Sequence, residues 1–276
     1  MRAKAFALCI AALFMLSALA TAAEAKGRPA FLDDGHGDKW VLKNDQISLW
    51  FQGKKPMLKV FRTGADGNRT GYMLKIEDIL EKDASGDVVA DVNLEQARPQ
   101  DWAVSSEQGN ASMNLTMAAD IEQPGAKGGS GGVTIVFHIN STSSEVKFDV
   151  IVEDWQWRSA DRENATLALK LLVVNVKLQQ KSGNEVSVDD VGYVKWAPTA
   201  EADGGTINVT HVIGSEGNAA HIILTFEGSG NASRLEYDPT VGISKATTGK
   251  AVSSVGTVAV IVVAAVAAYV LSRRRK

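Results

Sequence analysis

The feature of this sequence that most limits its fold is a two-residue alternation of apolar and polar side chains. In residues 145–153, for example, Val146, Phe148 and Val150 alternate with Lys147 and Asp149. Successive side chains of a β-strand point to opposite faces, so this pattern predicts a strand with one buried and one wet face. The same period recurs from about residue 47 to residue 243, between clusters of residues that are typical of turns.

About a dozen such strands, each with one wet face, predict an all-β ectodomain folded as an antiparallel β-sandwich over residues 47–245. The nearly apolar residues 167–176 predict a central strand covered on both faces. Residues 76–82 also fit one or two helical turns. The glycine-rich residues 125–132 leave two small domains as an alternative to one large sandwich. The predicted strands are residues 47–51, 57–62, 72–78, 88–93, 102–107, 112–121, 133–140, 145–153, 167–179, 193–197, 206–213 and 220–226.

The N-terminal residues predict a secretory signal peptide over residues 1–25. Arg2 and Lys4 provide the positive start, residues 5–19 are apolar, and Ala25 ends an A-x-A cleavage site. The alternative is an N-terminal anchor that stays uncut, but the apolar run is short for a membrane span. Residues 26–46 are then expected to form a lead before the folded ectodomain.

The C-terminal residues predict one transmembrane helix. Residues 251–271 carry no charge and consist mainly of valine and alanine, and a helix needs about 20 residues to cross the hydrocarbon core. The basic residues 272–276 follow at once, which places this tail in the cytoplasm and the ectodomain outside the cell. Residues 246–250 form the linker. A cleavable sorting tail has the same layout and is the alternative, although no LPxTG-like motif precedes the helix.

Charge and cysteine content exclude several classes of function. Without the signal peptide and the basic tail, lysine plus arginine fall from 29 to 23 and aspartate plus glutamate from 32 to 31. The ectodomain is thus near −8, which argues against nucleic acid as a partner. Cys9, the only cysteine, lies in the signal peptide, so the mature chain has no disulfide and no thiol for catalysis or metal binding. We expect no cofactor.

N-glycosylation sequons are far more frequent than chance predicts. Seven of the twelve asparagines begin an N-x-S/T sequence, whereas the serine and threonine content predicts roughly 1.5. This excess indicates exposure to a glycosylation system outside the membrane. Three of these asparagines fall on the polar faces of predicted strands, in agreement with the sandwich. The sequon asparagines are Asn68, Asn110, Asn114, Asn140, Asn164, Asn208 and Asn231.

Two aromatic residues form the most unusual local sequence, Trp155-Gln156-Trp157. Their spacing places both indoles on one face of a strand, where they could contact a ligand or partner such as a sugar ring. The alternative, which we favour, is that both fill the core.

The histidines and acidic segments give weaker signals. His211 and His221 flank a turn, but pairing His211 opposite Ile222 buries one coherent face and points His221 outward, so a core histidine is favoured over a metal pair. The acidic residues 33–38 lack the ligand spacing of a known calcium loop. The sequence also has no G-x-S-x-G, H-E-x-x-H or phosphate-binding glycine motif.

The sequence therefore predicts a single-pass, N-glycosylated cell-surface protein that is structural, adhesive or ligand-binding rather than an enzyme. Its expected partners are the membrane and a surface glycan or another surface protein. Two alternatives remain open, a membrane-tethered hydrolase of glycans or peptides and an accessory subunit of a membrane complex.

Overall fold

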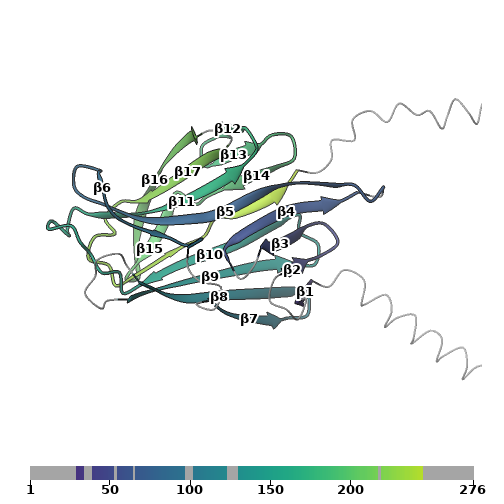
Figure 1. The fold of residues 1–276 in the computed structure, drawn as a ribbon, viewed down its shortest axis with the longest axis horizontal. Coiled ribbons are helices and arrows are strands. Elements are labelled where there is room, and N and C mark those ends of the chain that lie inside the picture. The colour runs from purple at the N-terminus through teal and green to yellow at the C-terminus, as the bar shows by residue number, and fades with distance from the viewer. Residues whose placement is uncertain are drawn as a thin grey trace, which may run out of the picture. The chain divides into compact units, whose positions relative to one another are not determined.

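A computed structural model describes residues 29–33, 39–52, 55–64, 66–96, 102–122, 130–216 and 219–244 (Figure 1). In these ranges the chain forms nineteen β-strands and no helix, and every strand pairing is antiparallel. The expectation of an all-β, antiparallel architecture is confirmed. The strands are β1 Ala30–Asp33, β2 Lys39–Lys43, β3 Ser48–Gln52, β4 Met57–Thr63, β5 Arg69–Lys82, β6 Val88–Asn93, β7 Trp102–Gln108, β8 Ser112–Glu122, β9 Ser130–Asn140, β10 Glu145–Glu153, β11 Thr166–Val174, β12 Leu178–Ser182, β13 Glu185–Val188, β14 Gly192–Lys195, β15 Thr199–Ala202, β16 Gly205–Glu216, β17 Ala219–Phe226, β18 Arg234–Tyr237 and β19 Thr240–Ile243.

The strands form two sets, joined by the long strand β16. In the first set, β1 to β5 pair in sequence, and β5 then pairs with β6 and β11, followed by β17. In the second set, β7 to β10 pair in sequence, and β10 continues to β18 and β19, which lead to β15 and to β14, β13 and β12. The first residues of β16 pair with β15 and the rest, from Val209 onward, pair with β17.

Buried side chains of the two sets meet in one core. Phe51 of β3 lies edge-on to Phe137 of β9, with ring centroids 5.0 Å apart. The hydroxyl of Tyr72, on β5, donates a hydrogen bond of 2.9 Å to the carbonyl oxygen of Tyr193 on β14. Apolar burial and these cross-set contacts hold the sets together.

Strand β5 contains an irregularity that explains the ambiguity of residues 76–82. Lys170 of β11 pairs with Asp78 and the next residue, Leu171, pairs with Ile76, so Glu77 is an extra residue on β5. Such a bulge shifts the alternation by one, which brings Glu81 onto the buried face. These residues form a strand, and the alternative of helical turns is wrong.

The central position of β11 is confirmed, since it lies between β5 and β17. One of its faces, which carries Leu169 and Leu171, is fully buried. On the other face Lys170 and Leu172 are only half-buried, so this side is less covered than the sequence predicts.

Several strands lie where the sequence predicts none. Strands β1 and β2 fall within residues 26–46, the expected lead, yet β2 pairs with β3 along its whole length. The sequence also predicts no strand at β13, β15, β18 or β19, and the single strand predicted over residues 167–179 is divided between β11 and the first two residues of β12.

The predicted signal peptide, linker, transmembrane helix and basic tail lie outside the described residues. Among the residues that are described, no helix is long and apolar enough to cross a membrane.

Candidate functional site

All seven sequon asparagines lie in the described part of the chain, and none of them is buried. Asn114 is half-buried on β8, and the other six are exposed in turns, at strand ends or on the outward side of β16. In the turn between β4 and β5, the backbone and side-chain amides of Asn68 donate hydrogen bonds of 3.0 and 2.7 Å to Asp66. These bonds lower the pKa of the Asp66 carboxyl below its ordinary value and fix the Asn68 turn.

Asn114 belongs to a polar row across β8, β9 and β10. Its Oδ1 lies 2.9 Å from Nδ1 of His138, whose Nε2 lies 2.6 Å from a carboxylate oxygen of Asp149. The His138 side chain is half-buried.

A cluster of carboxylates continues this outer face. Oxygen atoms of Asp149, Glu236 and Asp238 lie within 4.8 Å of one another, a spacing that could hold a metal ion. However, Nζ of Lys147 lies 2.7 Å from Asp238 and 3.6 Å from Asp149. The pKa of the Lys147 ammonium is raised above its ordinary value, mainly by its hydrogen bond to Asp238. Lys147 therefore already supplies a positive charge to this cluster, and the four residues form an ion-pair network.

The two tryptophans singled out in the sequence do not share one face of a strand. Strand β10 ends at Glu153, and Trp155 and Trp157 lie in the irregular segment that follows it. Trp155 is buried, and its indole N–H donates a hydrogen bond of 2.9 Å to the buried carboxylate of Glu81. Trp157 is half-buried and packs against the core. Trp155 thus lies in the core, whereas Trp157 packs at its edge with part of its surface exposed.

The two histidines that flank the β16–β17 turn lie on opposite faces of the sheet. His211 pairs with Leu224, and His221 pairs with Gly214. The observed register differs by two residues from the predicted pairing of His211 with Ile222. Because a shift of two residues keeps each side chain on the same face of the sheet, the two histidines still lie on the faces that the sequence predicts. The ring of His211 lies 4.8 Å from that of Trp196. Of the acidic residues 33–38, only Asp33 lies in the described part of the chain.

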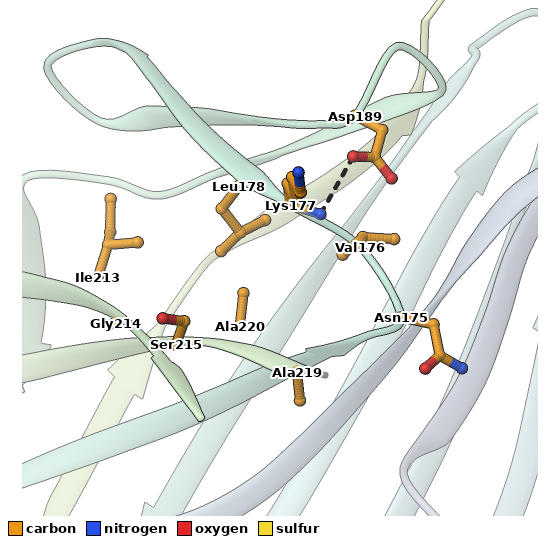
Figure 2. A pocket seen from close by; sticks show the side chains of 10 residues that line it. All are labelled: Asn175, Val176, Lys177, Leu178, Asp189, Ile213, Gly214, Ser215, Ala219 and Ala220. Carbon is orange, nitrogen blue, oxygen red and sulfur yellow. Dashed lines mark hydrogen bonds between the residues drawn. The ribbon is translucent and has the colours of Figure 1, made fainter. Parts of the chain in front are cut away.

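A hollow of about 1010 Å³ opens between β12 and the end of β16 (Figure 2). Apolar side chains such as Leu178 and Ile213 lie on its walls, and the backbone N–H of Lys177 donates a hydrogen bond of 3.1 Å to Asp189. Among its described lining residues, Lys177 and Asp189 are the only charged ones. These described residues offer few charged groups that could orient a ligand.

A smaller hollow, of about 340 Å³, lies over the outer side of β1 to β4, and we call it the Trp50 hollow. Leu32, Val41 and Trp50 occupy one row across β1, β2 and β3, and all point away from the core. Phe61 of β4 lies edge-on to Trp50, with ring centroids 5.0 Å apart. The guanidinium of Arg69 lies 4.2 Å from the centroid of the Trp50 ring, within the range of a cation–π interaction.

Comparisons with known proteins do not identify a relative. No protein-family model matches the sequence, and no curated protein matches it. Among the described residues that line the Trp50 hollow there is no histidine or cysteine, whereas aromatic and cationic groups are present. Aromatic and cationic groups of this kind can contact a ligand.

Gly71 lies opposite Phe61, one of the residues that line this hollow. It pairs with Phe61, and a Cβ atom at residue 71 would lie 2.1 Å from the carbonyl oxygen of Val60 and 2.5 Å from Cβ of Phe61. Gly71→Ala is expected to destabilise the protein by about 1–3 kcal/mol through overpacking. Gly132→Ala on β9, where the nearest atom would be 3.7 Å away, is the matched control and should be neutral or slightly stabilising. Urea unfolding of both variants checks this, and equal stabilities would contradict the geometry.

Proposed function

We propose that this chain is a single-pass, membrane-anchored and N-glycosylated cell-surface protein whose ectodomain acts by binding rather than by catalysis. The observation that carries the proposal is that six of the seven sequon asparagines are exposed and none is buried, in a chain where chance predicts roughly 1.5 sequons. A glycan must project into solvent, so a sequon on a buried face could not carry one. The apolar residues 251–271 and the basic tail support the anchor.

We also propose that the ectodomain is a β-sandwich, with the two strand sets as its layers. Phe51 and Tyr72 of the first set contact residues of the second, and Phe226 of β17 lies 5.0 Å from Tyr237 of β18. Inner faces that interdigitate in this way are the usual core of such a fold.

Binding is favoured over hydrolysis by the groups that the described residues bring together. His138 contacts an asparagine and a carboxylate, and the ring of His211 packs on Trp196. Neither arrangement resembles a nucleophile activated by a base. The Trp50 hollow, in contrast, presents an aromatic ring and cations at the surface.

Intact-mass measurement and glycopeptide mapping of the chain extracted from its native membrane test this proposal. We expect occupied sequons, an N-terminus at Lys26 and retention of the tail from Arg273 to Lys276. A cytoplasmic chain that still begins at Met1 and carries no glycan would overturn it. A membrane-extracted chain that lacks residues 251–276 would instead support the cleavable sorting tail and overturn the anchor.

A further inference from the structure

We propose that the Trp50 hollow binds an acidic saccharide unit, that is, a sugar ring that bears a carboxylate. This inference rests on the proposed function, because it assigns a ligand class to a surface-exposed binding domain. The argument depends on the shape of the hollow, on its charge and on the ring at its centre.

The shape of the hollow suits a small ligand. Its volume of about 340 Å³ lies near the lower end of the range of ligand pockets in proteins, roughly 300–1,000 Å³. A protein partner would need a surface of about 800 Å² on each side. A hollow of this size instead accommodates one or two sugar rings.

The charge of the hollow opposes that of the ectodomain. Lys43 and Arg69 line it on the face of the sheet that carries Trp50, and Asp45 is the only carboxylate among its described lining residues. Within the described part of the chain neither of these two cations forms an ion pair, whereas Lys75 and Lys170, on the same strand set, lie 2.8 and 2.9 Å from glutamate oxygens. Two cations without a carboxylate partner thus lie at one hollow of an acidic domain. Guanidinium groups bind carboxylates through paired hydrogen bonds, so a carboxylate is the complementary group.

The aromatic ring provides the second half of the recognition. The indole of Trp50 is half-buried on the outer sheet face, and its N–H donates no hydrogen bond within the described residues. The guanidinium of Arg69 lies over this ring, 4.2 Å from its centroid, and covers that face of the indole. A sugar at the edge of the indole would accept a hydrogen bond from the N–H and place its carboxylate near the guanidinium.

The test is a calorimetric titration of the membrane-extracted full chain in detergent with a glucuronic-acid-containing disaccharide. The matching neutral glucosyl disaccharide is the ligand control. We expect the acidic disaccharide to bind about tenfold or more tightly than the neutral one, because a charge-assisted hydrogen bond contributes that much. Equal affinity for both sugars, or no heat from either, would overturn the proposal.

Two substitutions place the binding at this hollow. Arg69→Gln should weaken binding of the acidic disaccharide about tenfold or more. Lys177→Gln removes an exposed cation from the larger hollow and should leave the affinity unchanged. Both sites are on the surface, and circular dichroism checks that both variants fold. Weakening by Lys177→Gln but not by Arg69→Gln would overturn the assignment.

The sequon at Asn68 adjoins Arg69, so the titration is repeated with Asn68→Gln. Unchanged affinity is expected. Binding that appears only in this variant would overturn the proposal, because the chain's own glycan would then fill the hollow. Failure to bind in a chain whose sequons are occupied and whose anchor is retained would overturn this inference and leave the proposed function standing.

Discussion

Replacing Glu81 with alanine is expected to destabilise the protein by about 3–5 kcal/mol, because three donors lose their acceptor at a cost of roughly 1–3 kcal/mol for each buried one. The Glu81 side chain is fully buried. Its carboxylate accepts hydrogen bonds from the Trp155 indole at 2.9 Å, from the Arg158 backbone N–H at 2.8 and 3.0 Å, and from the Ser159 backbone N–H at 2.6 Å. Without it, three donors in the segment between β10 and β11 lose their acceptor.

Chemical denaturation measures this loss, and hydrogen exchange locates it. The amides of Arg158 and Ser159 should lose protection in Glu81→Ala. Glu81→Gln retains one acceptor oxygen and should fall between the wild type and the alanine variant. Glu227→Ala, at an exposed glutamate, is the matched control and should change stability by less than about 0.5 kcal/mol. A loss below about 1 kcal/mol for Glu81→Ala would contradict the assigned role of this carboxylate.

Glu81 also shows where prediction from the sequence reaches its limit. Strict alternation from Tyr72, Leu74 and Ile76 places residue 81 on the wet face, which is the normal place for a glutamate. The bulge at Glu77 reverses the faces, and only the pairing with β11 reveals it. The partners of Glu81 lie 74 to 78 residues away, so no local pattern indicates them.

Strand prediction succeeded where alternation runs over six residues or more. The bounds of β6 and β10 agree with the sequence analysis to the residue. Strands β13, β15, β18 and β19 have only four residues each, too few for a two-residue period to stand out. Their strand conformation depends on pairing with neighbours distant in sequence, and propensity alone does not determine it.

Part of the candidate site can be predicted from the sequence. Leu49 and Phe51 are core residues, so Trp50 between them must face outward, and this signal was available. The position of Arg69 over the Trp50 ring cannot be predicted in this way, because Arg69 lies on β5 and reaches Trp50 across β4. The spacing of Trp155 and Trp157 places both indoles on one face only if the two residues lie on a strand. Strand β10 ends at Glu153, before both of them, so the spacing does not determine where they point.

The packing of the two strand sets leads to the second large effect, that of Phe137→Ala. Phe137 is fully buried on β9, and its ring lies 5.0 Å from Phe51 of the first set and 5.6 Å from Phe148 of its own set. Truncation removes the ring and leaves a cavity, so we expect a loss of about 3–5 kcal/mol in the free energy of unfolding. Val212→Ala, at a valine that is 58% exposed, is the control and should change stability by less than about 0.5 kcal/mol.

A double-mutant cycle with Phe51→Leu and Phe137→Leu then tests whether the two sets form the layers of one sandwich. Leucine keeps much of the volume and removes the edge-to-face contact between the rings. If the layers pack as proposed, the two substitutions should be coupled by about 0.5–1.5 kcal/mol. Strictly additive effects would mean that the rings do not meet in solution, and the two strand sets would then need a different arrangement around β16.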